Sequence, residues 1–120
     1  MRFSIVKPWL LTSLYYSLLI ALSSIPRLKL PKPDGVPTDK YFHCIAYGGL
    51  GFLLARTQSP WWVVLGIGAV LGGLDETYQR FIPGRSCGWG DWLADCGGVV
   101  LGLTVWHLIL RMGSVLRKTE

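Results

Sequence analysis

Four apolar stretches, separated by shorter polar segments, dominate the hydropathy pattern of the chain. Each stretch carries few charged residues or none, and a helix that crosses the hydrocarbon core of a membrane needs about 20 apolar residues. The pattern therefore predicts an all-α fold, an integral membrane bundle of four short transmembrane helices in a single domain of residues 1–120. The expected helices cover residues 9–25, 41–55, 61–78 and 92–110.

The second and third apolar stretches are short for a membrane span. At a rise of about 1.5 Å per residue, residues 41–55 and 61–74 do not cross a hydrocarbon core that is about 30 Å thick. Both become long enough if they extend into their polar neighbours, Asp39-Lys40 and Asp75–Gln79. We therefore expect charged groups to enter the edge of the membrane, or the bilayer to thin around them.

The segments between the stretches contain residues that break helices. Residues 26–38 hold four prolines, residues 56–60 form a short turn, and residues 80–90 form a Gly/Pro loop. Such segments favour loops over helices. A polar tail that includes basic residues is expected to follow the fourth helix.

The first stretch also allows a second interpretation, a cleaved signal peptide. Arg2 and Lys7 provide a basic start, and Ala21-Leu22-Ser23 has the small-x-small pattern of a cleavage site. Tyr15 and Tyr16 in the middle of the apolar stretch argue against this interpretation.

Composition supports the membrane interpretation. The 120 residues are 51% hydrophobic and 16% charged, whereas about 25% of residues are charged in an average soluble domain. The net charge is +5, but the basic residues lie on the flanks of the apolar stretches, as membrane insertion requires. No basic helix alternates with aromatic residues, so we expect no nucleic-acid partner. The bilayer is the expected partner.

The three cysteines form neither a CxxC pair nor an even set. They therefore indicate no disulfide framework and no zinc site of the usual spacing. A disulfide between Cys87 and Cys96 stays open if both face an oxidising compartment.

Glycines recur at helical spacing within the apolar stretches. Small residues three or four positions apart let two helix backbones approach closely inside lipid. We therefore expect helix contacts at Gly48/Gly51, Gly68/Gly72 and Gly98/Gly102.

Alternate crossing of the membrane would bring polar residues from three helices to one face. The start of the second helix, the end of the third and the start of the fourth all lie on the same side, whichever way the protein inserts. Charges near lipid are costly, so these groups are expected to face one another in one polar site. The candidate ligand-binding residues are Lys40, His43, Tyr47, Glu76, Gln79, Arg85, Asp91 and Asp95.

A purely structural role for these residues is the alternative. Ion pairs between Glu76 and Arg85 and between Lys40 and Asp95 would hold the helices together without any ligand. His107, alone in the fourth stretch, is expected to be a packing or interfacial residue.

The ordered set of polar residues resembles the VanZ-like family, and the resemblance covers residues 9–110. The matching motifs are Asp39-Lys40-x-x-His43, Tyr47, Asp75-Glu76-x-x-Gln79-x-Phe81-x-Pro83-Gly84-Arg85 and Asp91-x-x-x-Asp95-x-x-Gly98. The family consists of small bacterial membrane proteins, and its founding member is associated with resistance to the glycopeptide teicoplanin. The resemblance implies a multi-pass protein of the bacterial cytoplasmic membrane and the cell envelope. The family usually has Asn where this chain has Asp95, so a shared mechanism cannot be carried over at that position.

The orientation in the membrane depends on how the basic residues are counted. The 12 Lys and Arg residues divide equally between the two sides. If Lys40, Arg80 and Arg85 are set aside as site residues, the positive-inside rule places both termini in the cytoplasm. The polar site would then lie at the outer face.

Three functions remain open at this stage. The first is a cell-envelope protein that binds an anionic lipid or cell-wall precursor headgroup, with Lys40, His43 and Arg85 meeting its phosphate. The second is an enzyme that acts on such a headgroup, with His43 or Glu76 as the general base. In that case Asp91 and Asp95 would orient the base or hold a divalent cation. The third is a subunit of a channel or transporter completed by oligomerisation.

No motif assigns a reaction. The sequence lacks a nucleophile motif such as GxSxG and any metal-ligand spacing of high specificity. His43, Glu76, Asp91 and Asp95 are therefore catalytic candidates only under the enzyme hypothesis. No resident metal or cofactor is predicted, and the ligand and the oligomeric state stay open.

Overall fold

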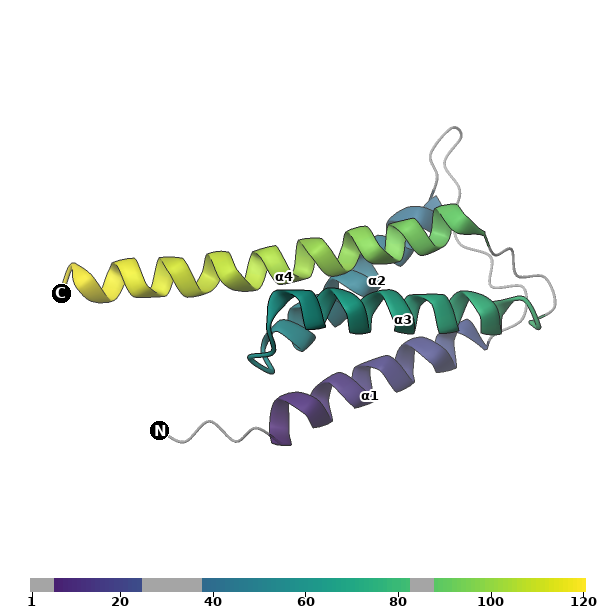
Figure 1. Cartoon of the computed structure of the whole chain (residues 1–120), viewed down its shortest axis with the longest axis horizontal. Helices are drawn as coiled ribbons and strands as arrows, with labels where there is room; N and C mark the ends of the chain where they lie inside the picture. The colour runs from purple at the N-terminus through teal and green to yellow at the C-terminus, as the bar shows by residue number, and fades with distance from the viewer. Residues whose placement is uncertain (1–5, 25–37, 83–87) are drawn as a thin grey trace.

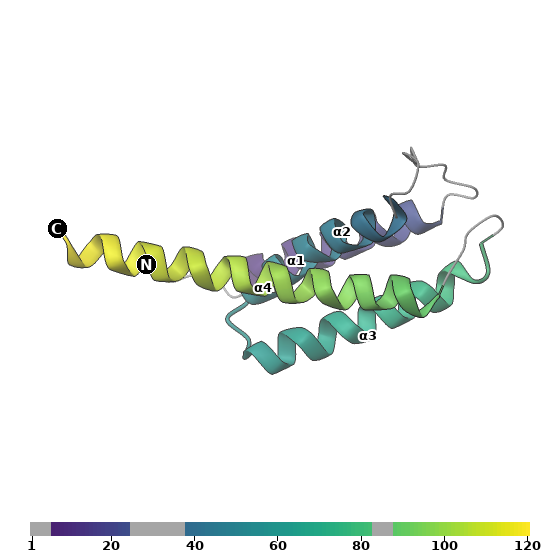
Figure 2. The same ribbon diagram turned by 90° about the horizontal axis from the view of Figure 1, so that it is seen from above.

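The computed structural model describes residues 6–24, 38–82 and 88–120, and within them the chain is all-α, without strands. Four helices follow one another: α1 (Val6–Ser23), α2 (Thr38–Ala55), α3 (Trp61–Gln79) and α4 (Trp89–Lys118). They run along one long axis in alternating directions (Figures 1 and 2). The start of α2, the end of α3 and the start of α4 therefore lie at the same end of the bundle.

The helix boundaries match the sequence analysis at the polar ends and differ at the C-terminus. α2 begins at Thr38 and α3 continues to Gln79, so both helices extend into their polar neighbours as expected. The expected end at residue 110 is wrong, because α4 continues to Lys118. Residues 111–118 contain no proline, and Arg, Met, Leu and Lys are good helix formers. Gly113 alone is too weak a breaker to end the helix.

Glycines set the distance between α2 and α4, which share the largest interface. A Cβ atom added at Gly98 would lie 2.9 Å from the backbone nitrogen of Gly48. One added at Gly102 would meet the carbonyl oxygen of Gly48 and the backbone nitrogen of Phe52. Gly51 packs in the same way against the backbone of Val99. The helix backbones are in direct contact here, which confirms the expected role of these glycines.

The glycines of α3 contact α4 through side chains. A Cβ at Gly68 would lie 2.6 Å from Cγ2 of Val99, and one at Gly72 would lie 3.2 Å from Cβ of Asp95. Both expected contacts are therefore present. Gly72 also leaves space for the buried side chain of Asp95.

Hydrogen bonds to backbone carbonyls attach α1 to the rest of the bundle. The hydroxyl of Tyr15 donates to the carbonyl of Ala46 in α2 at 2.6 Å. The hydroxyl of Tyr16 donates to the carbonyl of Leu71 in α3 at 3.1 Å. These two tyrosines therefore join α1 to both neighbouring helices.

The interior is small and the exterior is largely apolar. Leucine, isoleucine and valine side chains are exposed on all four helices, and Ile45, for example, is 72% exposed. Among the described residues, α4 is the one helix that passes a length and composition test for a membrane span, and Tyr41–Ala55 is a shorter apolar helix. The buried hydrophobic core consists of Leu19, Tyr47, Leu50, Leu54, Ala55, Val64, Val99 and Leu103.

Candidate functional site

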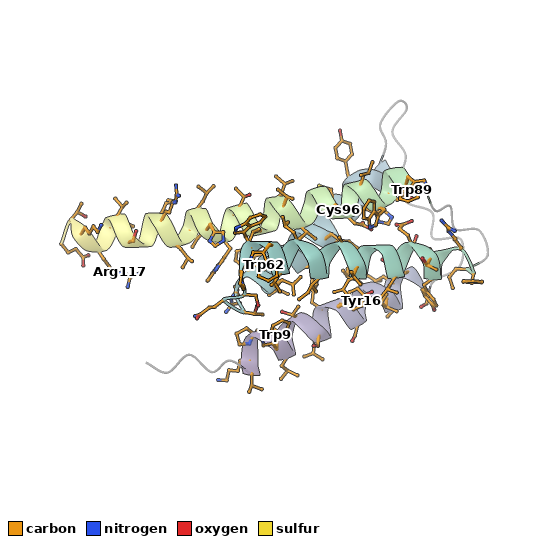
Figure 3. The ribbon with its side chains drawn as sticks, in the orientation of Figure 1. Trp9, Tyr16, Trp62, Trp89, Cys96 and Arg117 are labelled. Carbon is orange, nitrogen blue, oxygen red and sulfur yellow. The ribbon has the colours of Figure 1, made fainter. Side chains whose placement is uncertain are left out.

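Three helices contribute one side chain each to a polar cluster. His43 lies in the first half of α2, Glu76 near the end of α3 and Asp95 in the second turn of α4. Nδ1 of His43 lies 2.8 Å from Oδ1 of Asp95, within hydrogen-bond distance, and 3.6 Å from Oε1 of Glu76. The cluster occupies the end of the bundle where Figure 3 labels Trp89 and Cys96, away from Trp9 and Trp62. The structure thus brings together the three helix ends that the sequence placed on one side.

A second buried pair adjoins this cluster. The hydroxyl of Tyr47 donates to Oδ2 of Asp75 at 3.0 Å, and both side chains are buried. Tyr47 follows His43 by one turn of α2, and Asp75 directly precedes Glu76 in α3. Asp75 was part of the sequence motif but was absent from the list of site residues. Its adjacency to Glu76 was the available signal, but no local pattern indicated that it points into the bundle.

Gln79 extends the polar interior toward α1. Its side chain is 2% exposed, and its Nε2 donates to Oγ of Ser23 at 3.4 Å. Ser24 and Tyr78 are joined nearby through their hydroxyls at 2.7 Å. The sequence analysis placed Gln79 in the site, whereas it did not identify Ser23 as its neighbour.

Four carboxylate oxygens in this region are buried without a hydrogen-bond partner among the described residues. They are Oδ1 of Asp75, both oxygens of Glu76 and Oδ2 of Asp95. Leaving one buried acceptor unsatisfied costs about 1–3 kcal/mol, and more if it is charged. The cluster and the adjoining Asp75 together hold three carboxyl groups and one imidazole, so an anionic ligand at this end of the bundle would also need basic side chains beside them.

Several predicted site residues are not positioned by the structure. Arg85 and the side chain of Lys40 lie outside the described residues, so their proposed pairing with Glu76 and Asp95 stays a prediction. The described partner of Asp95 is His43. Asp91 is half-buried in the first turn of α4, one turn before Asp95.

Two further expectations concern a histidine and a cysteine. His107 is exposed in the second half of α4, apart from the residues that surround His43. Cys87 lies outside the described residues, so the disulfide with Cys96 remains an untested alternative.

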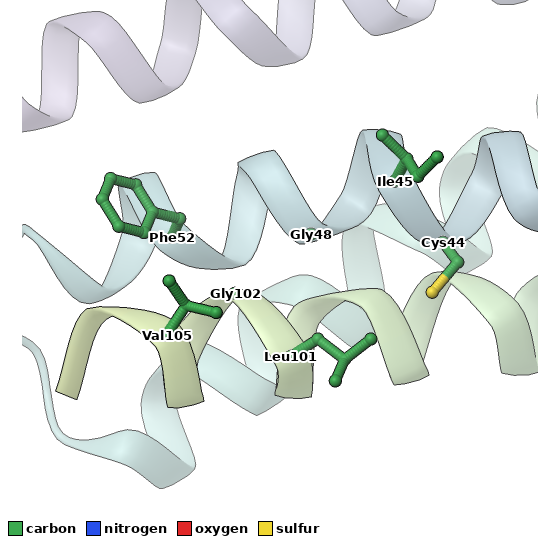
Figure 4. Close-up of a pocket in the computed structure, with 7 residues that line it drawn as sticks. All are labelled: Cys44, Ile45, Gly48, Phe52, Leu101, Gly102 and Val105. Atoms are coloured by element: carbon green, nitrogen blue, oxygen red, sulfur yellow. The ribbon is translucent and has the colours of Figure 1, made fainter. Parts of the chain in front are cut away.

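An apolar groove of about 310 Å³ lies between α2 and α4 (Figure 4). It begins at Cys44, the residue after His43, and continues along the α2–α4 interface past Gly48 and Gly102 to Phe52. The groove exists because the glycines expose the backbones of both helices at this point. Its lining residues are Cys44, Ile45, Gly48, Phe52, Leu101, Gly102 and Val105.

The cluster has the residue types of both an acid–base site and a metal site. His43, Glu76 and Asp95 each offer one ligand atom, and these atoms lie within 4.8 Å of one another. A histidine whose Nδ1 bonds to a buried carboxylate is also held in a fixed orientation, with Nε2 left for proton transfer. The geometry alone permits either chemistry.

Comparison with known proteins identifies the family. The comparisons found no matching curated protein and no matching solved structure. The model of the VanZ/LLP1 family matches residues 2–111, a range that includes all of the described polar cluster. The chain therefore belongs to the VanZ-like family.

Proposed function

We propose that this VanZ-like protein is a multi-pass membrane protein of the cell envelope that binds an anionic lipid or cell-wall precursor headgroup. The observation that carries the proposal is the buried, incompletely partnered polar cluster of His43, Glu76 and Asp95. A cluster of this kind at one end of a bundle with an apolar exterior is typical of a ligand site at a membrane face. The adjoining apolar groove would accommodate part of an acyl chain.

The exposed apolar side chains support a position within the bilayer. Water-soluble proteins rarely expose a continuous apolar surface of this extent, whereas lipid tails contact such side chains favourably. In the proposed arrangement all four helices cross the membrane and both termini lie in the cytoplasm. The polar cluster then lies at the outer face of the cytoplasmic membrane.

Reporter fusions after residues 35, 58, 88 and 120 test this topology. Fusions at residues 35 and 88 should report the outer side, and fusions at 58 and 120 the cytoplasmic side. The reverse assignment would preserve four crossings and move the cluster to the inner face. Any other grouping would contradict the four-span arrangement.

The headgroup proposal assigns phosphate binding to Lys40, His43 and Arg85. Three carboxyl groups would repel a phosphate if all were charged, so these basic side chains must offset them. Arg85→Ala should then fold normally but lose the stabilisation that wild type gains from short-chain phosphatidylglycerol in detergent. Arg117→Ala, which removes the same charge from the exposed C-terminal end of α4, should keep it.

The alternative of purely structural pairing gives a different result. If Arg85 serves only to neutralise Glu76, then Arg85→Ala should lower the melting temperature without a separable loss of lipid binding, because it leaves a buried charge unpaired. The same result for His43→Ala would end the headgroup proposal.

A second candidate function is catalysis on the bound headgroup. The hydrogen bond between His43 and buried Asp95 favours it, since a general base is commonly oriented by a carboxylate. Under this hypothesis His43→Gln should lose turnover of the headgroup, measured as released phosphate or amine, to a much greater extent than it weakens lipid binding. Absence of turnover in wild type with bound lipid would leave the protein a binding protein.

A further inference from the structure

We propose that His43, Glu76 and Asp95 together bind one divalent transition-metal ion of the Zn²⁺ or Mn²⁺ class. The ligands would be Nδ1 of His43 and one carboxylate oxygen from each acid. This site needs no lipid, so the inference goes beyond headgroup binding and is testable without it.

The spacing of the three side chains fits a metal with open coordination positions. Nitrogen and oxygen ligands lie about 2.0–2.2 Å from Zn²⁺, which places neighbouring ligand atoms roughly 3–3.6 Å apart. Nδ1 of His43 lies 2.8 Å from Asp95 and 3.6 Å from Glu76. The three ligand atoms all lie within 4.8 Å of one another, so small side-chain rotations suffice. Three protein ligands leave positions for water or for a ligand oxygen.

The unpartnered oxygens are a second observation, independent of the spacing. Glu76 is 6% exposed and Asp95 is fully buried, yet Oδ2 of Asp95 has no hydrogen-bond partner among the described residues, and the backbone N–H of Gly88 lies near the Glu76 carboxylate but outside good hydrogen-bond geometry. One imidazole N–H can satisfy one of these oxygens. A divalent cation would bond to both carboxylates and neutralise their charge at the same time.

The ligand set determines the class of metal. Imidazole nitrogen suits Zn²⁺ and other transition metals, whereas Mg²⁺ and Ca²⁺ prefer oxygen ligands throughout. Asp75, the third buried acid, is held by the hydroxyl of Tyr47 and lies outside the set. One nitrogen and two carboxylate oxygens therefore favour Zn²⁺ or Mn²⁺ over Mg²⁺ and Ca²⁺.

The test uses the full chain in detergent, purified through a tag that contains no histidine and stripped of metal with a chelator. Mn²⁺ is then added and followed by the loss of its free-ion paramagnetic resonance signal, and Zn²⁺ is counted by mass spectrometry after desalting. We expect one ion per chain and a higher melting temperature with metal, because an ion that binds only the folded state stabilises it. Mg²⁺ and Ca²⁺ should compete poorly.

Glu76→Gln separates metal binding from folding. It removes one of three crowded carboxyl groups, so the metal-free variant should melt at or above the temperature of wild type. Its affinity for Mn²⁺ should fall at least tenfold, and His43→Ala should lose binding altogether. His107→Ala, which removes the only other histidine of the chain, is the matched control and should bind metal like wild type.

Two results would overturn the inference. The first is a folded wild-type protein that takes up neither Mn²⁺ nor Zn²⁺ at millimolar concentration, which would mean that protons neutralise the cluster. The second is uptake that persists unchanged in Glu76→Gln and His43→Ala, which for Zn²⁺ would point to the cysteines. If the protein binds metal but no lipid, this inference stands and the proposed headgroup function falls. If it binds lipid but no metal, the headgroup function stands and this inference falls.

Discussion

The two halves of α4 have similar apolar side chains and very different surroundings. In the first half, residues 89–103, the buried positions include Asp95, Gly98 and Gly102. In the second half, residues 104–118, no residue is buried, and the helix projects beyond the other three toward the C-terminus (Figure 1). The second half keeps a contact with α2, where the ring of Trp106 packs against Phe52, so the two halves differ mainly in their glycines and in the buried acid, and much less in their hydrophobicity.

The proposed position in the bilayer would explain this difference. Apolar side chains gain little there from leaving the surrounding tails, so close backbone approach and interhelical hydrogen bonds determine which surface is buried. Gly98 and Gly102 permit that approach, whereas Gly97 and Gly113 on the same helix would have open space around an added Cβ. Position on the helix therefore decides whether a glycine contributes to packing.

The largest expected effect comes from replacing one glycine in each half of α4 by alanine. Gly102→Ala should reduce the free energy of unfolding by about 3 kcal/mol, because the new methyl group overpacks a contact between two backbones. Gly113→Ala should be neutral or should stabilise by up to about 1 kcal/mol, because alanine favours the helix. Unfolding in mixed micelles measures both. Equal losses in the two variants would show that the halves do not differ as described.

A smaller effect is expected from the polar side chains of the same helix. Asp95→Ala removes the hydrogen-bond partner of His43 and should cost about 2 kcal/mol. Thr104→Ala, at an exposed position of the second half, should change stability by less than about 0.5 kcal/mol. Asp95→Asn keeps an acceptor for His43 and should lose less than Asp95→Ala. If Asp95→Ala does not change the free energy of unfolding, Glu76 must replace Asp95 fully as the hydrogen-bond acceptor of the His43 imidazole.

The smallest effect is expected from removing the end of α4. A chain that stops after residue 111 lacks no buried residue, so it should lose less than about 0.5 kcal/mol. The melting temperature in detergent, measured at several protein concentrations, checks this. A larger loss that depends on concentration would show that the second half packs against another copy of the chain.

Periodicity and topology predicted the helices and the meeting of their polar ends. The extension of α3 to Gln79 followed from the length that a membrane span requires, and the contact of His43 with residues of α3 and α4 followed from alternate crossing. The glycine contacts followed from their spacing. These predictions succeeded because they depend on general constraints of helix geometry and do not require the exact packing of side chains.

Other features depend on packing that no local pattern encodes. The sequence did not indicate which acid His43 would contact, because helix rotation and depth decide between Glu76, Asp91 and Asp95. It did not place Asp75 opposite Tyr47 for the same reason. The prediction that α4 ends at residue 110 failed because charged residues were taken to end the helix, whereas they only end its apolar surface.

The tyrosines of α1 donate to backbone carbonyls, and this choice of acceptor has an evolutionary consequence. Every residue type supplies a carbonyl, so Ala46 and Leu71 can change identity without losing the bonds from Tyr15 and Tyr16. The same is true of Ala69, whose carbonyl accepts from Nε1 of Trp92 at 3.0 Å. In an alignment of relatives the donor residues Tyr15, Tyr16 and Trp92 should therefore be retained. The residues that supply the accepting carbonyls should vary independently of them. Contacts inferred from sequence covariation would then miss the attachment of α1 while detecting that of α2 to α4.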